Sequence, residues 1–218
     1  MTDSSKTPHN PRLRLAVLIL AAGQGSRLGG YPKALLQQNG ISLLRRFCKS
    51  VTSFSPVETL VVTGFYSDQI EKEAQSINQE LRGQITWVNN LNPNAGQSSS
   101  VRLGLESLKS DYDALLIALC DQPNIGALEI DALIEQFQQR LPGQEIILPI
   151  VKGQRGNPVL FSKGVIDKIL SIPAMSCRPF MDEHSVLVRT FESENEAYVL
   201  DVDTSTDIQK LGLQKMNQ

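Results

Sequence analysis

A glycine-rich segment with two cationic side chains is the part of this sequence best suited to chemistry. It runs from Leu20 to Lys33 and reads LAAGQGSRLGGYPK. Small residues allow backbone N–H groups to approach an anion closely. Arg27 can contact two phosphate oxygens at once, and Lys33 adds a point charge. The combination predicts a triphosphate site at the end of a strand.

Two well-known phosphate-binding loops do not fit these residues. The dinucleotide pattern G-x-G-x-x-G needs a glycine where Leu28 stands. It also expects an acidic residue after the second strand, where the segment 63–65 is Thr-Gly-Phe. The P-loop needs Gly-Lys-Ser/Thr, whereas Lys33 lies between proline and alanine. A structural turn with two solvated cations is the remaining alternative to a phosphate site.

Aspartates that follow apolar segments are the candidate metal ligands. Asp121 comes after the apolar run 114–119, which predicts a buried strand ending at the same sheet edge as the glycine-rich segment. Asp201 and Asp203 follow another apolar run, at a spacing that points both to one side of an extended chain. Mg²⁺ takes one or two protein carboxylates and completes its shell with phosphate and water oxygens. We expect Asp121 and one of these two, with a slight preference for Asp201, to hold Mg²⁺. A turn role for Asp121 and a helix-capping role for Asp203 are the alternatives.

The other polar and reactive residues are less specific. The stretch 97–100 (Gln-Ser-Ser-Ser) precedes a helical pattern, so it reads as an N-cap cluster that can also contact a pyrimidine. Arg102 is either a surface cation or a phosphate contact. Cys120 continues an apolar strand, which favours a packed thiol over a nucleophile. His9 and His184 have no zinc-ligand spacing.

The elements that must position these residues alternate between strands and helices. Apolar runs predict strands at residues 15–20, 59–63, 85–88, 114–119, 146–150, 158–161 and 197–202. Helical patterns cover residues 41–54, 66–77, 101–108, 128–139, 162–170, 180–191 and the chain from about 206. A turn at 152–156 predicts a late antiparallel insertion in a mainly parallel sheet. We therefore expect one α/β domain over residues 12–218, after a disordered start at 1–11.

Composition excludes several classes of protein. The chain has 218 residues, of which 41% are hydrophobic, and a formal charge of −2, so a general nucleic-acid binder is not expected. Its three cysteines show no C-x-x-C pattern. Neither a secretory leader nor an apolar run of about 20 residues, the length a membrane helix needs, is visible. We expect a cytoplasmic protein without a membrane partner.

Taken together, the motifs resemble those of the MobA-like nucleotidyltransferases. The glycine-rich segment matches L-A-A-G-x-G-S-R-[LM]-G-x-x-P-K, and the resemblance extends over the chain from Leu15 onward. The branch that it resembles best is the molybdenum cofactor cytidylyltransferases. Further matches lie, in order, at residues 61–64, 92–101, 119–123, 155–161 and 200–204.

The resemblance implies a three-layer, Rossmann-like nucleotidyltransferase domain and assigns its site residues. Arg27, Lys33 and Asp121 would be catalytic, and Asp121, Asp201 and Asp203 would be the metal ligands. The acceptor would lie against Arg155, Gly156, Asn157 and Pro158. The nucleotide would lie against Leu20, Ala21, Ala22, Gly23, Gln24, Gly25, Ser26, Arg27, Lys33, Thr63, Gly64, Asn94, Gly96, Gln97, Ser98 and Ser99.

The implied reaction is Mg²⁺-dependent transfer of CMP from CTP to the phosphate of molybdopterin, with release of pyrophosphate. Ala22 favours CTP, because the guanylyl branch usually has glycine there. Asn157 replaces the histidine that is usual in the family, which leaves the acceptor open. The alternatives are guanylyl transfer to molybdopterin, transfer to a sugar or alcohol phosphate, and a non-catalytic escort of molybdenum cofactor. A molybdoenzyme that receives the product would be a partner.

Overall fold

An eight-stranded sheet forms the centre of the computed structural model, which describes residues 13–216. The expected disordered start at 1–11 lies outside the described residues, and the single-domain boundary stays a prediction. The strand order is β10-β7-β9-β6-β1-β4-β5, with β8 paired to β7. The strands are β1 (Leu15–Ala21), β4 (Glu58–Thr63), β5 (Thr86–Asn89), β6 (Ala114–Leu119), β7 (Ile146–Val151), β8 (Gln154–Arg155), β9 (Val159–Ser162) and β10 (Val188–Glu192).

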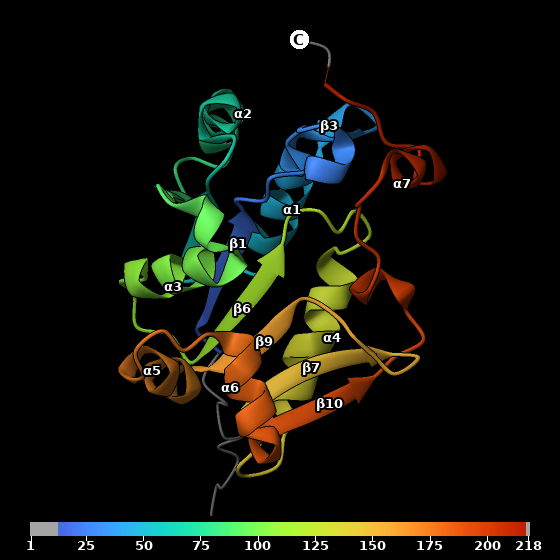
Figure 1. Cartoon of the computed structure of the whole chain (residues 1–218). Coiled ribbons are helices and arrows are strands. Elements are labelled where there is room, and N and C mark those ends of the chain that lie inside the picture. Colours follow the sequence, from blue (N-terminus) through green and yellow to red (C-terminus); the bar gives the residue numbers. More distant parts are fainter. Residues whose placement is uncertain (1–12, 217–218) are drawn as a thin grey trace, which may run out of the picture.

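Helices cover both faces of the sheet and make three layers, as expected (Figure 1). Side chains of β1 alternate between the faces, because successive residues of a strand point to opposite sides. Val17 and Ile19 pack in the core with α1 (Leu43–Thr52), α2 (Ser67–Glu80) and α4 (Ala127–Gln138). Ala16 and Leu18 pack in the core with α3 (Gln97–Ser107), α5 (Lys163–Ser171) and α6 (Cys177–Glu183). The continuous apolar run of β1 thus reflects burial on two sides.

The order in which strands are added to the sheet changes direction at β1. β1 pairs in parallel with β4 on one side and with β6 on the other, and β5 continues beyond β4. Figure 1 shows β1 and β6 side by side and pointing the same way. Open α/β sheets bind ligands at the carboxyl ends of the strands at such a point. The glycine-rich loop follows the carboxyl end of β1, and Asp121 follows the carboxyl end of β6, so both lie at this point of the sheet.

The late antiparallel insertion is confirmed. β9 runs antiparallel to both of its neighbours, β6 and β7. Within residues 13–216 no helix is long and apolar enough to cross a membrane. The remaining short elements are β2 (Gln37–Gln38), β3 (Ile41–Ser42), α7 (Ser205–Lys210), and the 3-10 turns η1 (Ser26–Leu28), η2 (Lys33–Leu35), η3 (Pro93–Ala95), η4 (Ser185–Leu187) and η5 (Glu196–Tyr198).

Two expectations for the last third of the chain are wrong. The helix expected at 180–191 ends at Glu183 as α6, and β10 follows as a strand parallel to β7. Its apolar residues Phe180, Leu187 and Phe191 have helical spacing, so periodicity alone could not show the break. The strand expected at 197–202 contains η5 followed by an extended segment outside the sheet. β7 already pairs with β9 and β10, so this segment has no place beside it.

Gly104 lets α3 lie close to β1, and its replacement should destabilise the fold. A Cβ at Gly104 would lie 2.5 Å from Cδ1 of Leu18, which is fully buried. We expect Gly104→Ala to lower the free energy of unfolding by about 1–3 kcal/mol, as other overpacked cores do. In the matched control Gly164→Ala, in α5, the nearest atom is 4.0 Å away, and the helix should gain stability. Equal melting temperatures for the two variants would contradict this account.

Candidate active site

A cavity of about 500 Å³ opens at the carboxyl ends of β1 and β6. Its walls come from the loop after β1, η3 with the start of α3, the end of β6 and the segment before α7, with Phe65 added from the loop after β4. The lining residues are Leu20, Ala21, Ala22, Gly23, Gln24, Arg27, Pro32, Lys33, Ala34, Phe65, Pro93, Asn94, Gly96, Gln97, Ser100, Leu119, Cys120, Asp121, Asp201 and Asp203.

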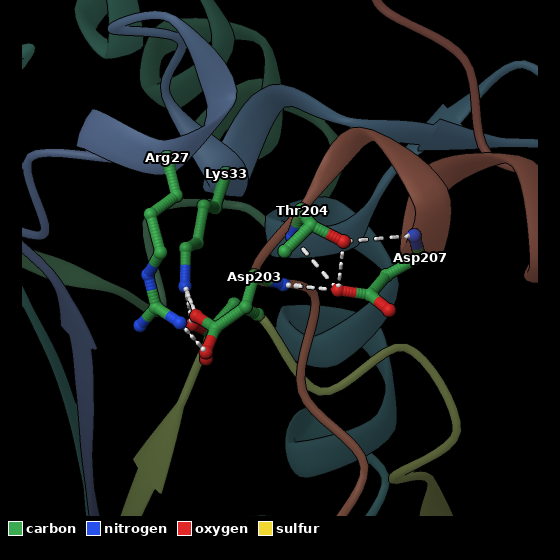
Figure 2. A network of polar contacts seen from close by, with 6 residues as sticks. Arg27, Lys33, Asp203, Thr204 and Asp207 are labelled. Atoms are coloured by element: carbon green, nitrogen blue, oxygen red, sulfur yellow. Dashed lines mark hydrogen bonds and ion pairs between the residues drawn. The ribbon is translucent and has the colours of Figure 1, made fainter.

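Lys33 joins two of the predicted metal carboxylates at one end of this cavity. Its Nζ lies 2.8 Å from Oδ2 of Asp121 and 2.7 Å from Oδ1 of Asp203. Arg27 reaches the other oxygen of Asp203, with Nη1 at 2.9 Å from Oδ2. Figure 2 shows both cations approaching Asp203 from the same side. Residues far apart in the sequence therefore meet at one cluster of alternating charges.

The ionisation of these groups follows from their contacts. Burial on its own lowers the pKa of Lys33, but the charges and hydrogen bonds of Asp121 and Asp203 outweigh it and raise that pKa. The hydrogen bond from Lys33 is the main cause that lowers the pKa of Asp203. Removal of its carboxyl from water, and then the charges of Asp121 and Asp203, raise the pKa of Asp201. The cluster thus keeps Lys33 charged and Asp203 ionised at neutral pH.

Asp203 is held by the start of α7 but does not cap it. Thr204 is the N-cap, and Asp207 completes a capping box with it. One oxygen of Asp207 accepts from the backbone N–H groups of Asp203 and Thr204, at 3.1 and 2.7 Å. Figure 2 shows this contact on the side of Asp203 away from the cations. The capping alternative for Asp203 is therefore wrong, and its carboxylate is free to face the cavity.

The segment 201–203, before α7, is held at the site by Val202, which bonds to the chain after β6 and packs in a small apolar cluster. The backbone N–H of Val202 donates to the carbonyl oxygen of Asp121 at 3.0 Å. Its side chain is fully buried against Leu28, Leu36, Leu43 and Leu213. Alternation along this extended stretch turns Asp201 and Asp203 toward the cavity and Val202 away from it.

The loop after β1 has the geometry of an anion cradle. Gly25 has φ +56°, and a Cβ there would lie 2.3 Å from the carbonyl oxygen of Tyr31, so the turn requires glycine. Within residues 13–216 the backbone N–H groups of Gly23 and Gln24 have no protein acceptor. These two donors and Arg27 line the same cavity. The arrangement can receive phosphate oxygens.

The donor set fits a divalent ion that takes most of its ligands from the substrate. Within the described residues no three His, Cys, Asp or Glu side chains converge to hold a metal ion by themselves. Three carboxylates and two cations line the cavity, so a triphosphate would meet a net negative wall. A cation that needs only one or two protein carboxylates, as Mg²⁺ does, suits this set.

A second cavity, of about 400 Å³, adjoins the first and shares Leu20, Gln97 and Leu119 with it. Its floor is apolar, with Ile117, Leu148, Val159, Phe161 and Met181 among its residues. The polar residues on its rim are Ser98, Arg155, Asn157, Ser176 and Arg178.

The predicted acceptor residues divide between this cavity and the fold. Arg155, Gly156 and Asn157 line the second cavity, and Pro158 does not. Arg155 forms an ion pair with Asp182 at 2.6 Å. A Cβ at Gly156 would lie 2.7 Å from the carbonyl oxygen of Tyr198, so this glycine also permits a close backbone contact.

Several predicted nucleotide residues lie outside the first cavity. Gly25 and Ser26 shape the loop, and Gly64 packs against Ala22, where a Cβ would lie 2.8 Å from the Ala22 methyl. Ser98 lines the second cavity instead. Thr63 is buried behind the lining and Ser99 bonds to Asn90 and Gly96.

Sequence reasoning missed some lining residues. Ser100 belongs to the stretch 97–100 that is expected to contact a pyrimidine, but it is not among the assigned nucleotide residues. It follows Gln97 by three residues, so a helix begun at Gln97 would have placed both on one face. Phe65 directly follows the match at 61–64, and Pro93 lies within the match at 92–101 but is not among the assigned site residues. Arg178 lies in the first turn of α6, where the sequence shows no motif, and nothing in the sequence pointed to it.

The remaining polar candidates have structural roles. The expected N-cap cluster at 97–100 is wrong, because α3 begins at Gln97 and Gly96 is its N-cap without a side-chain bond. Arg102 donates to the carbonyl oxygens of Ile169, Leu170 and Ile172 at the end of α5.

Cys120 and His184 show packing rather than chemistry. Burial raises the pKa of the Cys120 thiol, which agrees with a packed thiol. The ring of His184 stacks on Phe180, with centroids 4.1 Å apart.

Solved structures share this fold. The Mycobacterium sp. strain JC1 homolog of Mycobacterium tuberculosis Rv0371c is 26% identical, with a TM-score of 0.70, over 92% of this chain and 96% of that one. Rv0371c of Mycobacterium tuberculosis H37Rv in complex with manganese gives a TM-score of 0.65 at 18% identity, over 91% and 97% of the two chains.

Sequence relatives include enzymes of known name. The 2-C-methyl-D-erythritol 4-phosphate cytidylyltransferase of Streptomyces avermitilis is 30% identical over 152 residues, which are 69% of this chain and 60% of that protein. The bifunctional protein GlmU of Nostoc sp. (strain PCC 7120) is 26% identical over 192 residues, or 85% of this chain. This chain spans 41% of that protein and 20% of the GlmU of Synechococcus sp. (strain JA-3-3Ab).

The family model for the MobA-like NTP transferase domain matches residues 17–187. These include the glycine-rich loop, Asp121, α3, which lines both cavities, and β9, which lines the second cavity. The match covers well over half of the chain. The match and the relatives above support the family, and none of those relatives is named as a molybdenum cofactor cytidylyltransferase. The chain belongs to the MobA-like NTP transferase domain family.

Proposed function

We propose that this protein transfers CMP from CTP to the phosphate of an acceptor and releases pyrophosphate, with Mg²⁺ as its metal and molybdopterin as the acceptor. The observation that carries the proposal is the cluster in which Lys33 joins Asp121 and Asp203 beside the anion cradle. Ionisable groups with shifted pKa values that meet in a cleft are typical of functional sites, and here Lys33, Asp203 and Asp201 all show such shifts beside the cavity. The cytidylyltransferase among the relatives supports CTP.

The chemistry needs positioning and charge neutralisation more than it needs a base. An oxygen of the acceptor phosphate attacks the α-phosphorus of CTP, and the bond between the α- and β-phosphates breaks. The acceptor phosphate is already ionised near neutral pH, so no side chain has to remove a proton. Lys33, Arg27 and the N–H groups of Gly23 and Gln24 neutralise charge on the α-phosphate and the leaving pyrophosphate.

Asp121 and Asp203 are the carboxylates that we propose for the metal site. Mg²⁺ bound there would supply positive charge between the triphosphate and the acceptor phosphate. The sequence slightly favoured Asp201, but only Asp203 shares the Lys33 contact with Asp121. Asp201 lines the same cavity but forms no ion pair with Lys33. The manganese complex of Rv0371c supports a divalent ion in this fold.

The second cavity supports a flat acceptor body whose ring face is apolar and whose polar groups lie at its edge, opposite the polar rim. A sugar or polyol phosphate presents many hydroxyl groups, each of which needs a hydrogen-bond partner when it is buried. The floor of aliphatic and aromatic side chains offers few such partners. A pterin can lie on this floor while its phosphate reaches the shared wall at Gln97.

The direct test is pyrophosphate release with each nucleoside triphosphate and a panel of phosphorylated acceptors. The panel comprises molybdopterin, 2-C-methyl-D-erythritol 4-phosphate and a hexose phosphate. We expect release with CTP and molybdopterin. Release only with one of the other acceptors would replace the proposed acceptor and keep the reaction. Binding of molybdopterin without any release of pyrophosphate would favour the non-catalytic escort of molybdenum cofactor.

CTP should support turnover better than GTP. Ala22 lines the cavity, and glycine usually stands at its position in the guanylyl branch that the family resemblance offers as the alternative. We expect kcat/KM for CTP to exceed that for GTP by at least about tenfold, the scale on which one methyl group discriminates. Steady-state rates with the two nucleotides at a fixed acceptor concentration measure the ratio. Equal rates, or a preference for GTP, would overturn the cytidylyl assignment.

A further inference from the structure

Asn90 is a buried polar residue behind the wall of the first cavity. It directly follows β5, and its backbone N–H donates to the carbonyl oxygen of Thr63 at 2.9 Å, which extends the pairing of β4 and β5. Only 7% of its surface is exposed, and it does not line either cavity. The residue is therefore held in place by the sheet and cannot contact a ligand in the cavity directly.

The hydrogen bonds of Asn90 fix which way its amide group points. Its Oδ1 accepts from the backbone N–H of Asn92 at 3.0 Å, and a backbone N–H can only donate. The Nδ2 group must then face the first turn of α3. It donates to Oγ of Ser99 and to Oγ of Ser100, both at 2.9 Å. Both N–H donors of this side chain are thus used, and its oxygen accepts one hydrogen bond.

These bonds decide what the two serine hydroxyls can do. Ser99 accepts from Asn90 and donates its own proton to the carbonyl oxygen of Gly96 at 2.7 Å. Ser100 also accepts from Asn90, but within residues 13–216 no protein atom accepts its proton. Ser100 is 3% exposed and lines the first cavity. Its hydroxyl can satisfy its donor only by pointing the proton into that cavity.

The lining residues near Ser100 differ in charge from the rest of the cavity wall. Lys33, Arg27, Asp121 and Asp203 make the phosphate end, whereas Asn94, Gly96, Gln97 and Ser100 carry no charge. A nucleotide whose phosphates lie at the charged end would place its nucleoside against α3.

We infer that Asn90 is a positioning residue that fixes the Ser100 hydroxyl as a hydrogen-bond donor toward an acceptor atom of the nucleoside. The inference rests on the proposed nucleotide site. A wall that presents a desolvated donor rejects a ligand that offers no acceptor, because the donor is then left unpaired. Asn90 thereby contributes to the selection of the nucleoside without touching it.

Asn90→Asp separates this role from a general role in holding the loop. The aspartate keeps an oxygen for the N–H of Asn92 but loses both N–H donors. The Ser100 hydroxyl would then donate to the introduced carboxylate and present its lone pairs to the cavity. The probes are Mg²⁺ with α,β-methylene-CTP, and Mg²⁺ with inorganic tripolyphosphate, which has no nucleoside. Both are titrated calorimetrically against the full chain.

We expect Asn90→Asp to weaken binding of the CTP analogue about tenfold, the scale of one unpaired hydrogen-bonding group. Tripolyphosphate binding should change much less. In turnover the nucleotide KM should rise while kcat is retained, since uniform binding is lost. In a Ser100→Ala background the same substitution should have little further effect on the CTP analogue. The introduced carboxylate carries its charge both with Ser100 and with Ser100→Ala. The difference between the two effects of Asn90→Asp therefore reports the Ser100 hydroxyl and not the added charge.

Three results would overturn the inference: unchanged binding of the CTP analogue, a full effect of Asn90→Asp in the Ser100→Ala background, or a parallel loss of tripolyphosphate binding. Thermal melting identifies a variant that fails to fold, in which case Ser100→Ala alone must weaken the CTP analogue selectively. The proposed function is judged separately by pyrophosphate release from the wild-type chain. Nucleotide binding without release would remove that function and still test Asn90.

Discussion

Asp121→Asn is expected to reduce kcat by at least about 10³-fold, because it removes a metal ligand as well as an electrostatic partner of the transition state. Asp203→Asn should have the same effect, since both carboxylates face the Nζ of Lys33 within 2.8 Å. The double variant should be no slower than either single one, because groups that act as a unit are strongly non-additive. The measurement is Mg²⁺-dependent pyrophosphate release for the four combinations of Asp and Asn.

Asp111→Asn provides the matched control for this series. Asp111 also pairs with a cation, Arg14, at 2.5 Å, but Arg14 precedes β1 and so lies at the opposite edge of the sheet. Its replacement should leave turnover unchanged. Full activity of Asp121→Asn, or turnover that persists in excess EDTA, would remove metal-assisted transfer. Strong loss in Asp201→Asn with an active Asp203→Asn would exchange the two C-terminal ligands.

Lys33→Ala should lower kcat by about 10²-fold or more, the usual result of losing one preorganised electrostatic donor. The side chain is only 18% exposed and bonds to two carboxylates, whereas Arg27 contacts Asp203 alone and cannot replace it at Asp121. The variant leaves Asp121 without its cationic partner and Asp203 with Arg27 only, and Mg²⁺ should therefore raise its melting temperature more than that of the wild type. Single-turnover rates and melting curves with and without Mg²⁺ test both statements.

Lys49→Ala is the control for Lys33. Lys49 pairs with Glu80 at 2.5 Å on the outer surface of α1 and lines neither cavity. It should keep the wild-type kcat and show no additional response to Mg²⁺. A Lys33→Ala variant with near-normal kcat would mean that this lysine serves only to neutralise the aspartates.

The sequence predicted the elements whose burial is uniform. β1 and β6 are buried on both faces, so their apolar runs identify them without ambiguity. β10 is an edge strand with half-buried and exposed residues, and its neighbours carry helical spacing. Which side of β7 it would occupy depends on tertiary packing that no local pattern records.

The site was predictable wherever a strand end or a glycine-rich turn marks it. Lys33, Arg27 and Asp121 all lie where the motifs placed them. The choice between Asp201 and Asp203 was not predictable, because both alternate toward the cavity and only the position of Lys33 separates them. Asn90 was missed because it acts on the cavity from behind, through the hydroxyl group of another residue.

The charged cluster also has a consequence for how the protein is made. Asp203 follows every strand of the central sheet in chain order, whereas Lys33 comes soon after the first. Synthesis runs from the N-terminus, and a domain generally folds as a unit. A nascent chain therefore contains β1, β4, β5 and β6, with Lys33 and Asp121, before the ribosome has produced the second carboxylate. Until then Arg27 has no partner in the cluster, and the growing polypeptide carries an anion-attracting loop that the finished molecule neutralises.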